Sequence, residues 1–331
     1  MIKDNCNVKP YFLITIDTEG DNLWSKPSTI TTKNAAYLYR FQELCEAHDF
    51  KPTYLTNYEM ATSQTFIQFG KDIIERKTGE IGMHLHGWNS PPLASLTKDD
   101  FKTQPYLIEY DKEVMREKII YLTNLLEETF GIKMVSHRAG RWAFNEDYAE
   151  ILHELGYKID CSVTPFVNWK NKKGDPSKAG GSNYEYSPRE AYFVDINDIN
   201  SEGNSKLLEI PMTIIPTQCK FNKFVSKRCK DRSLSKKISN KLFPGVYWLR
   251  PNGKNLKELL YIVNEAINNN SKYVEFMLHS SELMPGGSPT FPTDRHIEKL
   301  YDDLKLLFGS INKAFKGATL EEFYNHAMEK Y

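Results

Sequence analysis

The apolar and polar residues of this chain follow two patterns that alternate along the sequence. Short runs rich in β-branched and aromatic residues are typical of buried strands, and apolar residues repeated every three or four positions are typical of helices. The first pattern predicts strands at residues 11–16, 52–55, 80–85, 134–136, 158–163, 207–215 and 273–278. The second predicts helices at about 33–49, 66–79, 111–130, 145–155, 254–268, 294–308 and 320–330. This alternation, with no evident linker, favours one α/β domain with a parallel, barrel-like sheet over two domains.

Composition and charge narrow the class of protein. Of the 331 residues, 40% are hydrophobic and 26% are charged, which is ordinary for a globular protein. Acidic and basic side chains number 43 each, so the overall charge gives no indication of a nucleic-acid partner. Five scattered cysteines lack the spacing of a metal site and indicate a reducing compartment. The sequence shows neither a signal-peptide pattern nor an apolar run of about 20 residues, so we expect a cytoplasmic protein.

The first predicted strand ends in a group of carboxylates. Asp17, Glu19 and Asp21 fall within five residues, directly after the apolar run 11–16. Carboxylates at the end of a buried strand are costly unless a metal ion, a cationic partner or open solvent compensates them. Asp17 and Glu19 would point the same way on an extended chain. From this segment alone, a solvated acidic turn is as good an interpretation as a binding site.

Three further predicted strands also lead into ionisable residues. His84 and His86 end one strand, Arg138 follows another, and His279 follows the strand at 273–278. A single histidine at a strand end is usually structural, but an HxH pair places two imidazoles on one side of the chain. Two imidazoles and a carboxylate form a recognised catalytic metal arrangement. If the strands are parallel, all four ends meet at the same face of the sheet.

These segments resemble the five motifs of the polysaccharide deacetylases, the NodB-like carbohydrate esterases. The matching segments are Thr15-Ile16-Asp17-Thr18-Glu19, Glu80 to Trp88 around His84-Leu85-His86, Arg138-Ala139-Gly140-Arg141-Trp142, Asp160-Cys161-Ser162-Val163 and Leu278-His279. The IDTE, HLHxW and HSSE segments are most similar to the subgroup found in surface-polysaccharide and lipopolysaccharide biosynthesis loci. The resemblance extends over about residues 10–326. It implies a distorted (β/α) barrel of about seven parallel strands, forming a single catalytic domain over 1–331 with insertions at about 165–206 and 216–250.

The resemblance also implies roles for individual residues. Asp17 would be the general base, Arg138 would orient it, and His279 would be the general acid. Glu19, His84 and His86 would bind a divalent metal, with zinc expected first and cobalt, nickel or manganese as alternatives. The substrate would contact Trp88, Trp142, Arg141 and Asp160. Trp169 offers a further flat face for a sugar ring, although packing is an equally good interpretation of each tryptophan.

Two departures from the family pattern affect the metal site. Many members space their two metal histidines four residues apart, whereas His84 and His86 are two apart and Trp88 occupies the more usual second position. The common Asp-Asp pair is Asp-Thr-Glu in this chain. The metal role therefore passes to Glu19, because threonine is a poor ligand for a divalent cation. An exchange, with Asp17 on the metal and Glu19 as the base, stays open.

The segment Lys220–Lys241 is strongly basic, with nine Lys or Arg residues and one Asp. Its default interpretation is a solvated surface, and the sharper hypothesis is contact with an anionic membrane or an anionic substrate.

The resemblance to the deacetylases also implies a substrate and an activity. The expected substrate is an N-acetylated sugar or glycan, with nucleotide- and lipid-linked forms both open. The expected activity is metal-dependent deacetylation in surface-polysaccharide or lipopolysaccharide biosynthesis. The alternatives are hydrolysis of a non-sugar C–N bond and a metal-free protein that only binds glycan.

Overall fold

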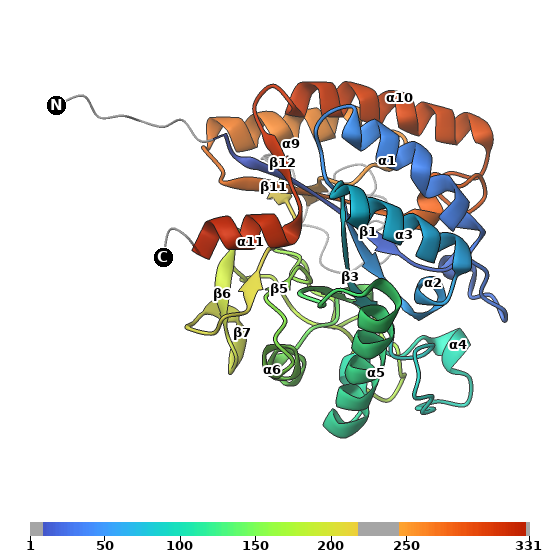
Figure 1. Ribbon diagram of the computed structural model, residues 1–331. Helices are drawn as coiled ribbons and strands as arrows, with labels where there is room; N and C mark the ends of the chain where they lie inside the picture. The colour runs from blue at the N-terminus through green and yellow to red at the C-terminus, as the bar shows by residue number, and fades with distance from the viewer. Residues whose placement is uncertain (1–8, 218–244, 329–331) are drawn as a thin grey trace, which may run out of the picture.

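The computed structural model describes residues 9–217 and 245–328, and within them a curled, mainly parallel sheet surrounded by helices (Figure 1). The strand order is β11-β1-β2-β3-β4-β5-β8-β6-β7, and the short strand β12 also pairs with β1. The parallel strands are β1 (Tyr11–Thr18), β2 (Thr53–Thr56), β3 (Glu80–Leu85), β4 (Ser136–Ala139), β5 (Ile159–Asp160), β8 (Leu208–Glu209), β11 (Tyr273–His279) and β12 (Lys316–Ala318). The predicted α/β class and parallel sheet are confirmed, and the predicted number of strands is not.

The sheet is a partial barrel and not a closed one. Strands β6 (Tyr192–Asp195) and β7 (Asp198–Glu202) form an antiparallel extension beyond β8. The predicted strand at 207–215 is interrupted, because β8 ends at Glu209 and β9 (Ile214–Pro216) pairs only with β10 (Val246–Trp248) in a separate ribbon. On the edge of β11 that faces away from β1, there is no strand ladder but only single hydrogen bonds. The Glu275 N–H donates to Thr213 Oγ1 at 2.8 Å, and the Met277 N–H donates to Leu249 O at 3.3 Å.

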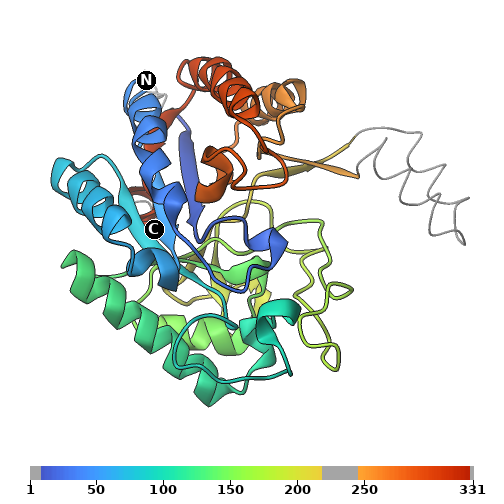
Figure 2. The ribbon, with the colours of Figure 1, turned by 90° about the vertical axis from the view of Figure 1, so that its right-hand side faces the viewer.

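Helices cover the outside of this sheet, as Figures 1 and 2 show. They are α1 (Leu38–Glu46), α2 (Tyr58–Ala61), α3 (Gln64–Arg76), α4 (Asp100–Thr103), α5 (Lys112–Phe130), α6 (Glu146–Glu154), α9 (Leu256–Asn268), α10 (Asp294–Ile311) and α11 (Leu320–Met328). Every residue of β1 is buried, as expected for a parallel strand with both faces covered. Among the described residues, no helix is long and apolar enough to cross a bilayer.

Local signals explain where several elements end. Asn145 begins α6 because its side chain accepts the Tyr148 N–H at 3.0 Å, and Gly131 ends α5 with a left-handed φ of 69°. The predicted helix at 33–49 is divided into a 3-10 turn, Lys33–Tyr37, and α1. The predicted strand at 134–136 is displaced, since β4 begins at Ser136 and includes Arg138 itself.

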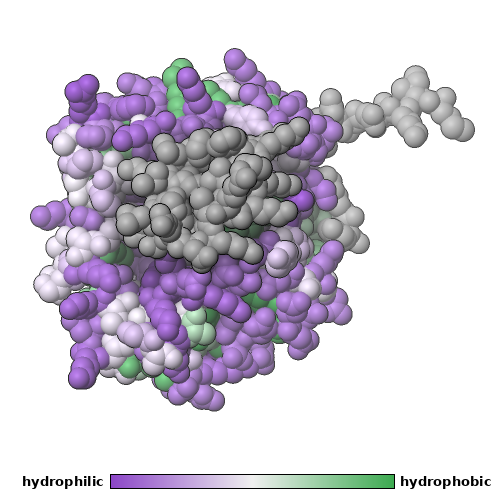
Figure 3. All heavy atoms as spheres, turned by 180° about the vertical axis from the view of Figure 1, so that it is seen from behind, coloured by the Kyte–Doolittle hydropathy of each residue, from purple (hydrophilic) through white to green (hydrophobic). Residues whose placement is uncertain are grey.

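On the face opposite to that of Figure 1, the described surface is mostly hydrophilic with small, separate apolar patches (Figure 3). The basic segment Lys220–Lys241 lies outside the described residues.

Candidate active site

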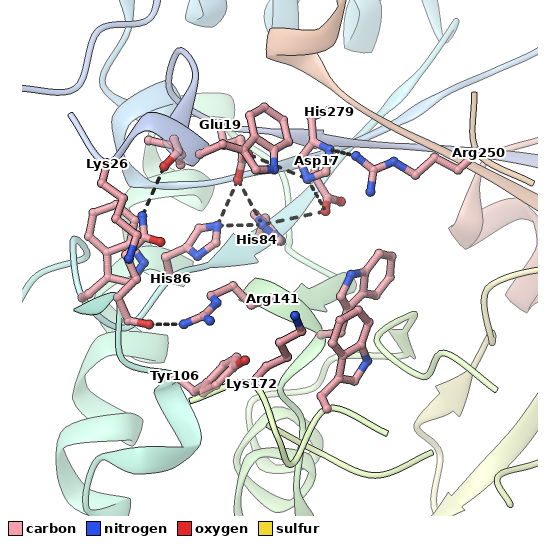
Figure 4. A pocket seen from close by; sticks show the side chains of 16 residues that line it. Asp17, Glu19, Lys26, His84, His86, Tyr106, Arg141, Lys172, Arg250 and His279 are labelled. Carbon is pink, nitrogen blue, oxygen red and sulfur yellow. Dashed lines mark hydrogen bonds and ion pairs between the residues drawn. The ribbon is translucent and has the colours of Figure 1, made fainter. Parts of the chain in front are cut away.

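The carboxyl ends of β1, β3 and β11 and the turn after β4 converge on one pocket of about 380 Å³ (Figure 4). The parallel register causes this convergence, because it pairs Asp17 with His279 and His84 with Arg138. The lining residues are Asp17, Glu19, Leu23, Trp24, Lys26, His84, His86, Trp88, Gln104, Tyr106, Arg141, Trp142, Trp169, Lys172, Arg250 and His279. The structure therefore brings together the strand-end residues that the sequence singled out.

Glu19, His84 and His86 form a buried group that could hold a metal ion. One ligand atom from each residue lies within 4.8 Å of the other two. His86 Nε2 is 2.9 Å from Glu19 Oε2 and 3.1 Å from His84 Nε2, and His84 Nε2 is 3.7 Å from Glu19 Oε2. Burial would raise the pKa of Glu19, but His279, His84 and His86 more than offset it and hold that pKa well below its usual range. Glu19 is therefore a carboxylate at neutral pH.

The orientation of His84 suits a metal ligand. Its Nδ1 lies 3.0 Å from the carbonyl oxygen of Arg138, which can only accept, so Nδ1 carries the hydrogen. The Nε2 lone pair of neutral His84 then points toward Glu19 and His86. A hydrogen bond from the other ring nitrogen to a backbone carbonyl is the usual support of a metal-binding imidazole. Burial lowers the pKa of His86 and favours its neutral form. Burial would also lower the pKa of His84, but the neighbouring carboxylates Asp17 and Glu19 more than offset it and raise that pKa. The donor set of two imidazoles and a carboxylate fits a divalent cation, zinc included.

Asp17 is fixed by the fully buried Arg138. Arg138 Nη1 lies 2.7 Å from Asp17 Oδ1, and its Nη2 pairs with Glu275 and donates to Thr15 Oγ1 at 2.9 Å. Burial would raise the pKa of Asp17, but Arg138 and then His84 and His279 more than offset it and lower it. The second oxygen, Oδ2, faces the pocket, at 3.9 Å from His84 Nε2 and 3.8 Å from His279 Nε2. Asp17 is thus an oriented carboxylate with one oxygen free toward the pocket.

His279 is held on the side of its ring that faces away from the carboxylates. Its Nδ1 is 3.0 Å from Arg250 Nη2 and 3.1 Å from Glu282 Oε2, and its backbone N–H donates to Glu282 at 3.0 Å. Its Nε2 lies 3.8 Å from both Asp17 Oδ2 and Glu19 Oε1. Trp24 packs edge-on against the imidazole at 4.9 Å between ring centroids. The ring therefore presents Nε2 to the pocket.

Aromatic side chains form one wall of the pocket and continue beyond it. Trp88 packs against His86, with 5.8 Å between ring centroids. Trp142 and Trp169 lie 6.0 and 6.3 Å from Trp248, which lines a neighbouring groove together with both of them. Flat apolar rings of this kind suit the faces of a sugar.

Asp160 does not line the pocket, which corrects the predicted substrate contact. It is fully buried, and its Oδ1 lies 2.6 Å from His137 Nδ1 while its other contacts include Ser162. His137 in turn contacts the Tyr148 hydroxyl at 2.7 Å. The short strand β5 pairs Asp160 with His137 on β4, so the carboxylate supports the sheet and is not exposed to a ligand.

Sequence reasoning missed several residues of the site. Glu275, the second partner of Arg138, stands between apolar neighbours on β11, and a lone acid in such a run signals a buried cationic partner. Glu282 and Arg250 hold His279, and the HSSE segment contains this glutamate three residues after the histidine. Neither periodicity nor strand ends give a signal for four other lining residues. Trp24 lies on a short 3-10 turn, Leu23–Ser25, and Lys26, Tyr106 and Lys172 lie on loops.

No protein-family model and no curated protein sequence matches this chain. Solved structures do match it. A "putative polysaccharide deacetylase" from Mycobacterium smegmatis aligns over 97% of this chain and 92% of its own, with 13% identity and a TM-score of 0.55. The chain shares the fold of the polysaccharide deacetylases.

Two further solved structures agree with that fold. A "putative glycoside hydrolase/deacetylase" from Parabacteroides distasonis aligns over 99% of this chain and 74% of its own, with 10% identity and a TM-score of 0.63. A 4-alpha-glucanotransferase from Thermococcus litoralis aligns over 96% of this chain but only 40% of its own, with 13% identity and a TM-score of 0.53. Likeness at this level of identity concerns architecture, so the activity is argued from the residues of the pocket.

Proposed function

We propose that this protein is a metal-dependent hydrolase that removes the acetyl group from an N-acetylated sugar. The observation that carries the proposal is the convergence of three separate units on one pocket: the Asp17–Arg138 pair, the Glu19/His84/His86 group and His279. A structural role for each would not require the three to share one space. The aromatic wall of Trp88, Trp142 and Trp169 favours a sugar over a non-sugar amide.

Glu19, His84 and His86 would hold the divalent metal, with zinc preferred for this donor set. When bound, the metal supplies Lewis-acid polarisation of the acetyl carbonyl and an acidified water. Glu19 suits this role better than Asp17, because Asp17 already engages Arg138 with one oxygen.

Asp17 would act as the general base. Its Oδ2 faces the pocket and would take the proton of the attacking water, while Arg138 keeps the carboxylate ionised and oriented. His279 Nε2, on the adjacent strand, would donate a proton to the departing amine. Glu282 and Arg250 position that ring through Nδ1. The resemblance of the motifs adds the expected setting, the synthesis of a surface polysaccharide or lipopolysaccharide.

A substrate panel tests the proposal. Purified protein loaded with zinc is incubated with free, nucleotide-linked and lipid-linked N-acetyl sugars, and with N-acetylated amino acids as non-sugar amides. We expect acetate release from at least one sugar and not from the amino acids. Release from the amino acids alone would favour the non-sugar alternative. Glycan binding without release from any compound would favour a binding protein.

A further inference from the structure

The pocket carries more positive than negative side chains. Two carboxylates, Asp17 and Glu19, lie at its base, and four cationic side chains line it: Lys26, Arg141, Lys172 and Arg250. In the proposed reaction, Asp17 pairs with Arg138 and Glu19 serves the metal, so the base of the pocket does not neutralise the cations of the wall. A neutral acetamido sugar would not compensate this excess of positive charge.

Arg141 and Lys172 are the two cations best placed to meet a ligand. Arg141 is partly buried, stacks on Tyr106 at 4.0 Å from the ring centroid and donates to the Gln104 carbonyl oxygen. Within residues 9–217 and 245–328, neither Arg141 nor Lys172 forms an ion pair. The carboxylate that acts on Arg141 from a longer distance is Glu109, whose Oε2 already accepts the backbone N–H groups of Tyr106 and Asp175. Arg250 differs, because Glu282 lies 3.2 Å from its guanidinium. A partly buried guanidinium that forms no direct ion pair is costly to desolvate, and an anionic group on a ligand would offset that cost.

The backbone that presents Arg141 is strained. Arg141 and Trp142 have φ values of 57° and 64°, in the left-handed region that side chains rarely adopt. Surrounding contacts hold this conformation: the Trp142 carbonyl accepts the Tyr184 hydroxyl at 2.6 Å, and the Arg138 guanidinium lies 4.8 Å from the Trp142 ring centroid. Strain that is retained beside a pocket is typical of residues that serve a ligand.

These residues also lie at the right place for a substituent of the sugar. Figure 4 shows Arg141, Lys172 and Tyr106 on one side of the pocket, across from Asp17, Glu19 and His279, with His84 and His86 between. An acetamide held at the metal group would leave the rest of the molecule to extend toward this wall.

We propose that the substrate is an anionic N-acetylated sugar, whose phosphate or carboxylate group is bound by Arg141 and Lys172. The proposal rests on the proposed deacetylation and specifies its substrate class. A guanidinium fork and a neighbouring ammonium group match the oxygens of either anion. Both anions share this chemistry, and the test separates them.

Binding is measured by isothermal titration on the zinc-loaded protein with three ligands: N-acetylglucosamine 1-phosphate, N-acetylglucosaminuronic acid and the neutral methyl N-acetylglucosaminide. We expect at least one anionic ligand to bind about tenfold or more tighter than the neutral one, the order of a charge-assisted hydrogen bond. The better of the two anions identifies the group as phosphate or carboxylate. The preference should fall as ionic strength rises.

The double variant Arg141→Gln/Lys172→Gln should lose this preference, so that its affinity for the anionic sugars falls to that for the neutral sugar. Lys170→Gln is the matched control, because Lys170 is exposed on the same loop as Lys172 and does not line the pocket. The proposal would be overturned if neither anionic ligand binds, or if neither binds more tightly than the neutral sugar. It would also be overturned if the double variant still binds the anionic ligands more tightly than the neutral one. Binding selectivity without acetate release would instead refute the deacetylase function and leave the anion site standing.

Discussion

Asp17 and His279 are register partners on the adjacent parallel strands β1 and β11, and Asp17 Oδ2 lies 3.8 Å from His279 Nε2. More than 260 residues of chain separate Asp17 from His279, yet both side chains reach the same pocket. A base and an acid that act on one carbonyl carbon must share such a space. The register of the sheet therefore provides the geometry that the proposed reaction needs.

Replacing Asp17 by Asn should lower the rate of acetate release by about 10²–10⁴, the usual worth of a positioned base. Arg138 keeps its pairing with Glu275 in this variant, so we expect the protein to fold. Steady-state kinetics and a chemical unfolding curve measure the two effects. Asp49→Asn, an exposed aspartate on a turn, is the control and should keep full activity. An Asp17→Asn variant with wild-type kcat would remove Asp17 from the mechanism.

Glu282 should act as a positioning residue for His279. Burial would raise the pKa of Glu282, but Arg250 and His279 more than offset it and lower it, so the carboxylate is charged beside the imidazole. We expect Glu282→Gln to lower kcat about tenfold or more with little change in KM, since an amide holds the imidazole through a weaker hydrogen bond than a carboxylate does. Steady-state kinetics separates the two constants. An unchanged kcat would assign Glu282 a purely structural role.

Metal content should depend on the two histidines of the HxH segment. His84→Ala and His86→Ala should each lose most bound zinc after dialysis, because each removes one of three donor groups. Zinc should also raise the unfolding temperature of the wild type, since it binds only the folded site. Elemental analysis and thermal unfolding report these effects, with the exposed His153→Gln as control. Full zinc occupancy in both alanine variants would place the metal elsewhere.

Glu59 should make the stability of the fold depend on pH. Burial raises the pKa of Glu59 to about 7, and its Oε1 accepts the Asn89 side-chain N–H at 2.7 Å. The folded state therefore holds this proton more tightly than the unfolded state, so stability should decrease as pH rises from about 4.5 to about 7.

The variant Glu59→Gln should remove that decrease. At each pH, the free energy of unfolding of the variant is compared with that of wild type. This difference should favour the variant by on the order of 1–3 kcal/mol more at pH 8 than at pH 4. Urea unfolding at several pH values measures the difference. Glu75→Gln, an exposed glutamate on α3, should leave the slope unchanged. If the stability of Glu59→Gln falls with rising pH as steeply as that of wild type, another group causes the pH dependence.

The sequence predicted the strand ends of this site well, because apolar runs that stop at charged residues are local patterns. Asp17, Glu19, His84, His86 and His279 all lie where those patterns placed them. It predicted Asp160 poorly, since the partner of that carboxylate, His137, is set by strand pairing and cannot be read from its own segment.

The open edge of the sheet and the cationic side chains of the pocket were also beyond local patterns. Segment 207–215 resembles one continuous strand, but it forms the two short strands β8 and β9. Between them, it contacts β11 only through isolated hydrogen bonds. Lys172 and Arg250 come from segments with no periodicity and meet Arg141 only through the fold.

The most direct test of the account measures acetate and free amine together from the best substrate of the panel. Zinc-loaded wild-type protein should release the two products in equal amounts. Protein stripped by a chelator should release almost none and recover when zinc is restored, and zinc-loaded Asp17→Asn should remain about 10²–10⁴ slower than wild type. Equal rates in the zinc-loaded, stripped and Asp17→Asn proteins, or no acetate from any N-acetylated sugar, would contradict metal-dependent deacetylation at this pocket.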